Sequence, residues 1–233
     1  MDNRHGNLFA QKMQRRAPPW HVAHGKVKPA GAEPGAPRLA TAVPAAKLPA
    51  MTAQVIQGIQ QLLATPALPE LGPQPRAHGQ SAAALNAQMD FLFREAKIPP
   101  PQQSLIRSLV LLWHDHLEAA HTIAQAIENP DGSFVHAIMH RREPDYWNAK
   151  YWWRRVGKHP AFPEIARRVG ALLRSRGAGE LAAKILPGGQ WEPGAFVDAC
   201  EVAATGGSPE QTEWLREVQR VETEVLLEFF CHE

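Results

Sequence analysis

Residues 113–162 read WHDHLEAAHTIAQAIENPDGSFVHAIMHRREPDYWNAKYWWRRVGKHPAF. Within this stretch, two segments with helical periodicity flank Asn129-Pro130-Asp131-Gly132, a sequence that favours a turn. A short connection between two helices makes them antiparallel neighbours. The stretch therefore predicts a helical hairpin, around which we expect the rest of the chain to pack.

Helical periodicity continues on both sides of the hairpin. The expected helices span residues 51–64, 81–97, 102–127, 133–142 and 144–157, with further helices up to about residue 230. No segment alternates apolar and polar side chains as a half-buried strand does. We therefore expect an all-α fold, an irregular bundle of about six to eight helices.

The composition changes along the chain. Fourteen of the 21 prolines lie before residue 102, and residues 17–50 offer almost no large apolar side chains. A segment that buries little apolar surface cannot offset the entropy lost on ordering. We expect a disordered, basic tail over residues 1–50, a short helix and a Pro-rich linker over 51–80, and a helical domain over 81–233.

Charge, hydropathy and cysteine content exclude several classes of protein. The formal net charge of +2 is too small to indicate nucleic-acid binding, and residues 192–233 carry ten acidic against two basic residues. No run approaches the ~20 apolar residues of a transmembrane helix. Cys200 and Cys231 form no disulfide framework or CxxC motif, which fits a reducing compartment. Because no secretory signal is evident, the expected location is the cytoplasm.

Each helix of the hairpin carries two histidines and one glutamate at the spacing i, i+4, i+7. They are His114, Glu118 and His121 before the turn, and His136, His140 and Glu143 after it. Residues at this spacing share one face of a helix. In an antiparallel pair, residues equidistant from the turn lie level, which puts His121 beside His140 and Glu118 beside Glu143. All six are candidate catalytic residues.

Four of these six side chains are candidate metal ligands, namely His121, His140, Glu118 and Glu143. Neutral imidazoles and carboxylates suit Zn, Mn or Fe, and a bound ion could activate water with the spare carboxylate as base. One alternative stays open, in which the first of these faces is solvated, because it lies opposite the apolar arc of its own helix.

The end of the hairpin and the helix that follows it combine arginines with aromatic residues. The candidate ligand-binding residues are Arg141, Arg142, Asp145, Trp147, Tyr151, Arg154 and Arg155. Aromatic rings can stack on a planar or sugar-like ligand while guanidinium groups bind its phosphate or carboxylate. Two alternatives stay open: the first two arginines pair with Glu143 or Asp145, and the rings pack in the core.

The segments WHDHLEAAHTIAQ and HAIMHRREPDYWNAKYWWRRVGKHPAF also resemble a known family. It comprises uncharacterised bacterial and fungal proteins that carry H-x3-H-RREPDY-x-N-A-x-YW-x-RRVG-x-HP. The resemblance covers about residues 105–175. It implies a helical protein and identifies no ligand, activity or catalytic residue.

These patterns together predict a pocket lined by histidine and glutamate and walled by aromatic and arginine side chains. We expect it to act on or bind a small polar or anionic molecule, with a divalent metal (Zn, Mn or Fe) as the candidate cofactor. Two other functions stay open: a module that binds such a ligand without turnover, and a structural or interaction protein. Membrane and nucleic-acid partners are not expected. The sequence decides neither whether the protein is an enzyme nor whether it forms a homo-oligomer.

Overall fold

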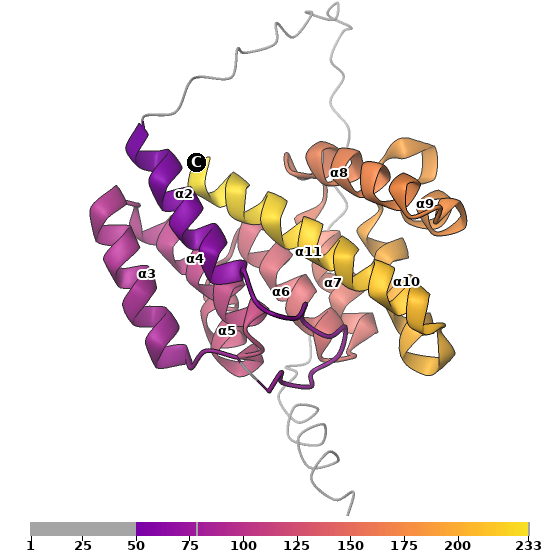
Figure 1. Cartoon of the computed structure of the whole chain (residues 1–233), viewed down its shortest axis with the longest axis horizontal. Coiled ribbons are helices and arrows are strands. Elements are labelled where there is room, and N and C mark those ends of the chain that lie inside the picture. Colours follow the sequence, from indigo (N-terminus) through magenta and orange to yellow (C-terminus); the bar gives the residue numbers. More distant parts are fainter. Residues whose placement is uncertain (1–49, 78, 233) are drawn as a thin grey trace, which may run out of the picture. The chain divides into compact units, whose positions relative to one another are not determined.

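The computed structural model describes residues 50–77 and 79–232 (Figure 1). Every regular element in this part of the chain is a helix, which confirms the all-α prediction. The tail predicted over residues 1–50 lies outside the described residues, apart from the last of them, which begins the first described helix.

The described residues form ten α-helices and one short 3-10 helix, so the predicted number of six to eight is too low. The elements are α2 (Ala50–Leu63), α3 (Ala82–Ala96), α4 (Pro100–Trp113), α5 (Leu117–Ala124), α6 (Pro130–Arg142), α7 (Tyr146–Val156), α8 (Phe162–Ser175), α9 (Gly179–Ile185), the 3-10 helix η2 (Pro187–Gly189), α10 (Pro193–Gly206) and α11 (Pro209–His232). One cause of the difference is a break in the longest predicted helix.

The helix predicted over residues 102–127 is two helices, α4 and α5. Between them, Asp115 adopts a left-handed backbone conformation with a φ of 68°. Aspartate tolerates this conformation better than most residues do, because its short side chain finds nearby hydrogen-bond partners. Here the Asp115 carboxylate accepts hydrogen bonds from Arg76 and Arg142, which hold the break in place.

Helix α6 is buried along almost its whole length. Every residue from Gly132 to Arg142 is buried, whether it is apolar or charged. The helix packs against α4, α5 and α7. Because a helix covered on all sides has no polar face, its sequence shows little amphipathic periodicity. This position brings the histidines and arginines of α6 inside the fold.

The turn between α5 and α6 is tight. Asn129 Oδ1 accepts a hydrogen bond from the Gly132 N–H over 2.8 Å, so Asn129 caps α6, and the predicted start at Ser133 is wrong. A Cβ atom on Gly132 would lie 2.2 Å from the carbonyl oxygen of Ile127. Only glycine allows the backbone to approach this closely. The turn thereby sets α5 directly against α6.

Helix α11, the yellow helix that runs diagonally across Figure 1, packs against α2, α4, α8 and α10. Helix α2 also contacts α3 and α4, and the described residues form one compact unit. Although α11 is 24 residues long, neither it nor another helix in the described part combines the length and apolar character of a membrane span.

Candidate metal-binding site

Three histidines from two helices come together beside the α5–α6 turn. His121 lies on α5, and His136 and His140 lie one turn apart on α6. One ligand nitrogen from each ring lies within 4.8 Å of the other two, a group that could hold a metal ion. The ring centroids are 4.7 Å apart for His121 and His136, 5.5 Å for His121 and His140, and 4.8 Å for His136 and His140. We call these three residues the histidine cluster.

The cluster differs in membership from the predicted ligand set. The sequence places His121 beside His140, and the two rings are indeed neighbours. His136, which the sequence leaves out of the metal ligands, is the third member. Its ring lies on the same face of α6 as His140, one turn nearer the α5–α6 turn, and this face meets α5.

Two members of the cluster belong to a stack of flat groups. The rings of His140 and His136 are nearly parallel, with an angle of 16° between their planes. On the other side of His136, the indole of Trp152 lies 3.9 Å away at an angle of 17°. The guanidinium carbon of Arg155 lies over the Trp152 ring, 5.2 Å from its centroid. The cluster is therefore covered on one side by α7.

Polar groups from two elements contact His140. Glu143 Oε2 lies 3.2 Å from His140 Nδ1, and the other carboxylate oxygen, Oε1, is buried without a hydrogen-bond partner among the described residues. From α7, Asn148 Nδ2 lies 3.1 Å from His140 Nε2. When a carboxylate accepts the Nδ1–H of a histidine, the lone pair of Nε2 stays available to a metal. This arrangement is common around protein-bound metals.

The electrostatics keep two of the rings neutral at pH 7. Burial, followed by the neighbouring charges of His140, His121 and Arg155, lowers the pKa of His136 to about 3. Burial and His140 also lower the pKa of His121, against the opposing effect of Glu143 and Glu118. In addition, His136 Nδ1 is buried with no partner among the described residues. Neutral rings with free lone pairs are the form in which histidine binds metals.

The spacing of the nitrogens is near the value that a metal requires. Two nitrogens bound to one tetrahedral zinc ion, each about 2.0–2.1 Å from it, lie about 3.3 Å apart. The cluster nitrogens, which lie within 4.8 Å of one another, must therefore close by up to about 1.5 Å. The parallel rings of His136 and His140 must also turn toward each other, and Asn148 must give up Nε2 of His140.

Two of the six candidate catalytic residues are not part of this site. Glu118 is exposed on α5 and belongs to no metal-capable group among the described residues. His114 lies at the end of α4, on the far side of the helix break, and its Nε2 lies 2.7 Å from the carbonyl oxygen of Leu62. The break at Asp115 removes His114 from the face that it would share with His121 on one continuous helix.

The two arginines at the end of α6, predicted from the sequence to bind a ligand, are buried in ion pairs with carboxylates of the protein. Arg141 is fully buried and forms a bidentate ion pair with Glu222 of α11, with N–O distances of 2.6 and 3.2 Å. Arg142 is also buried and donates to Asp115 over 2.7 Å. The alternative partners considered from the sequence, Glu143 and Asp145, are not those found. Neither guanidinium is accessible to a ligand.

The remaining candidates lie on α7. Asp145 caps this helix by accepting a hydrogen bond from the Asn148 N–H. Trp147 and Tyr151 are exposed, at 75% and 37% of their surface, and their rings stack on each other with centroids 6.4 Å apart. Tyr151 also meets Trp152 edge-on at 5.5 Å, so the exposed rings continue into the stack over the cluster. Arg154 and Arg155 are exposed beside them.

Sequence reasoning also missed a second histidine–carboxylate pair. His159 Nε2 lies 2.8 Å from Asp131 Oδ1, while Nδ1 accepts a hydrogen bond from the Ala161 N–H. The ring packs among Phe134 and Phe229. Because both nitrogens are occupied by protein groups, the pair ties the start of α6 to the start of α8 and leaves no nitrogen for chemistry.

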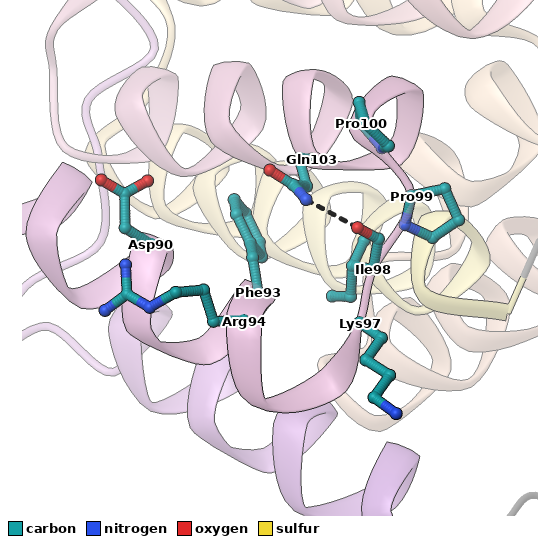
Figure 2. Close-up of a pocket in the computed structure, with 8 residues that line it drawn as sticks. All are labelled: Asp90, Phe93, Arg94, Lys97, Ile98, Pro99, Pro100 and Gln103. Atoms are coloured by element: carbon teal, nitrogen blue, oxygen red, sulfur yellow. Dashed lines mark hydrogen bonds between the residues drawn. The ribbon is translucent and has the colours of Figure 1, made fainter.

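A cavity of about 390 Å³ lies elsewhere, at the connection between α3 and α4 (Figure 2). Gln103 closes one side of it by donating to the Ile98 carbonyl over 2.6 Å. Its charged neighbours include Asp90 and Lys97, and none of its lining residues belongs to the histidine cluster. The cavity brings no nucleophile or metal-ligating group together, so the histidine cluster is the better candidate site.

Comparison of the chain with protein-family models, with curated proteins and with solved structures finds no match. The family resemblance seen over about residues 105–175 therefore stays a prediction. The site has to be interpreted from its own geometry.

Proposed function

We propose that this protein binds a divalent transition-metal ion through His121, His136 and His140. The observation that carries the proposal is the approach of three ligand nitrogens to within 4.8 Å of one another on two helices. Zinc is the first candidate, because it accepts three imidazoles and tolerates the tetrahedral geometry that such a set offers. Manganese and iron(II) are the alternatives, for which carboxylate ligands would be more favourable.

A site with three protein ligands leaves one position of a tetrahedral ion for water. A bound ion would lower the pKa of that water, so that hydroxide would be available at neutral pH. The function that the site supports best is therefore metal-assisted attack of water on a small polar molecule. The half-buried Glu143 has one carboxylate oxygen on His140 and the other, which is buried, unpartnered among the described residues, so it would hold a proton there.

Metal binding can be tested on the untagged full chain. Metal-free protein is titrated with Zn²⁺ in competition with a chromophoric chelator, and bound metal is counted by elemental analysis. We expect one ion per chain, and an affinity at least tenfold lower in His121→Gln and His136→Gln, since each loses one of three ligands. His116→Gln is the matched control, because His116 lies outside the cluster and contacts the Gln80 carbonyl.

The chain has other histidines, including His21 and His24, so binding alone is not sufficient. If His116→Gln and the two cluster variants bind zinc with equal affinity, the ion is held elsewhere and the proposal is wrong. Retention of wild-type affinity in a variant with both His121→Gln and His136→Gln would contradict it most directly.

One observation favours a structural role as the second candidate. His140, His136 and Trp152 form a continuous parallel stack, which is a stable arrangement for neutral rings without a metal. In that case His136→Phe preserves the stack and leaves the melting temperature unchanged, and zinc gives no thermal shift. For a metal site, zinc raises the melting temperature of the wild-type protein and not that of His136→Phe.

A further inference from the structure

We infer that the open coordination position of the histidine cluster takes a small anion, and that Arg155 attracts it. This inference rests on the proposed function, since it concerns the ligand that completes the metal site. The charge of the metal-loaded site favours an anion. Three neutral imidazoles add nothing to the two positive charges of the ion.

The nearby side chains do not cancel that charge. Glu143, at 3.2 Å from His140, is the one carboxylate in contact with the cluster among the described residues. Glu118 is exposed and further away, although its charge still acts on His121. Even with both carboxylates counted, Arg155 leaves the loaded site with an excess of positive charge. A low-dielectric surround strengthens the attraction for an anion.

The position of Arg155 points to the same ligand. Its guanidinium lies over the Trp152 indole, and that indole stacks on the His136 ring. The side chain is exposed and forms no ion pair with a residue that the structure describes. Its donors are therefore available to a ligand from solvent.

The neighbouring Arg154 serves as an internal comparison. It has the same side chain and is also exposed, but of these two arginines it is Arg155 whose guanidinium lies over the Trp152 ring among the described residues. An effect of overall positive charge on α7 would involve both arginines equally. An effect of position involves Arg155 alone.

Azide binding to the cobalt-loaded full chain tests this inference. Co²⁺ replaces Zn²⁺, and its visible absorption reports both metal binding and changes at the fourth ligand. We expect azide to change the spectrum in a saturable way. We expect Arg155→Ala to raise the azide Kd about two- to fivefold, as for one exposed charge interaction. Arg154→Ala should change it by less than about 1.5-fold.

The outcomes separate the two proposals. If Co²⁺ gives no cluster-dependent spectrum, the proposed function itself fails. If Co²⁺ binds and azide up to about 0.1 M leaves the spectrum unchanged, the metal site stands and the anion inference is wrong. The limit is about 0.1 M because exposed charges are already screened at that ionic strength. Equal Kd changes in Arg154→Ala and Arg155→Ala would overturn the assignment to Arg155.

Discussion

Glu143 Oε2 lies 3.2 Å from Nδ1 of His140, which precedes it by three residues at the end of α6. The pair fixes the orientation of the imidazole, because the ring is held between this carboxylate and Asn148. A hydrogen bond from Nδ1–H to a carboxylate also makes Nε2 a better electron donor. In the proposed metal site, the pair would therefore give Glu143 a positioning role, whereas the sequence predicts Glu143 as a direct ligand.

The first prediction compares the two glutamates that the sequence treats alike. Glu143→Gln should weaken zinc binding about 10- to 100-fold, as is typical when the partner of a histidine ligand is altered. Glu118→Gln should leave the affinity within about twofold, since Glu118 lies outside the metal-capable group. Chelator competition on both variants measures the difference. A larger loss in Glu118→Gln than in Glu143→Gln would show that the carboxylate of α5 is the ligand.

The buried pair of Arg141 and Glu222 leads to a prediction about stability. Burial raises the pKa of Glu222, and the Arg141 charge opposes that rise. Glu222→Gln alone should lower the free energy of unfolding by about 3–5 kcal/mol, because it leaves a buried guanidinium without its counter-charge. Arg141→Met combined with Glu222→Leu should recover most of that loss, because two apolar side chains bury no charge.

Urea unfolding of the single and double variants measures this effect. Glu213→Gln is the control, because it removes an ion pair with Arg216 in which the carboxylate is about half exposed. It should leave the unfolding midpoint nearly unchanged. If the double variant is no more stable than Glu222→Gln, the ion pair contributes more than an apolar replacement can, and the estimate above is wrong.

Local sequence patterns predict much of this fold. The spacing of residues over about twenty positions is enough to predict the hairpin, the helical class and the neighbouring positions of His121 and His140. What the patterns could not supply comes from distant segments. The partner of Arg141 lies 81 positions away on α11, and the break at Asp115 depends on Arg76 from the segment before α3. Apolar periodicity continues across that break, so no local signal marks it.

The sequence places His136 among the candidate catalytic residues but not among the metal ligands, for a different reason. Counting residues from the turn shows which positions of the two helices lie level. It does not show how far each side chain reaches along the neighbouring helix. His136 is one turn from the level position of His121, and its ring reaches the cluster because Trp152 packs against its other face. Since α6 is buried all round, its sequence also gives no polar face from which to choose.

His114 carries a prediction about pH. Its Nε2–H donates to the Leu62 carbonyl, and its buried Nδ1 has no partner among the described residues, so a second proton has no acceptor there. Burial accordingly lowers the pKa of His114 below 6.5. Below about pH 6.5 the unfolded chain therefore binds a proton that the folded chain does not, and stability falls as the pH falls.

Removing this group should flatten the pH dependence. Below pH 6.5, the free energy of unfolding of the wild-type protein decreases as the pH falls. In His114→Gln this decrease should be smaller, by up to about 1.4 kcal/mol per pH unit. Above pH 7.5 the two slopes should coincide. Urea unfolding at several pH values between 5 and 8, on metal-free protein, measures the slopes. Parallel slopes throughout would mean that His114 is protonated equally well in the folded and unfolded chains.

Asp115 carries the last prediction. Its carboxylate accepts from Arg76 at 2.8 Å and from Arg142 at 2.7 Å, and these hydrogen bonds keep the pKa of Asp115 below its ordinary value although burial raises it. Asp115→Asn keeps a residue that tolerates a positive φ but removes the charge. It should lower the free energy of unfolding by about 3 kcal/mol or more, because two guanidinium groups lose their counter-charge.

The same substitution should release the segment between α2 and α3. Arg76 donates to the carbonyl groups of Ala67 and Trp113 as well as to Asp115, so it holds this segment against the end of α4. In Asp115→Asn, limited trypsin digestion should cut after Arg76 before it cuts within the helices. Asp145→Asn is the matched control: asparagine caps helices as well as aspartate does, so this variant should digest like the wild-type protein. Wild-type resistance to trypsin in Asp115→Asn would show that other contacts are sufficient to hold the segment in place.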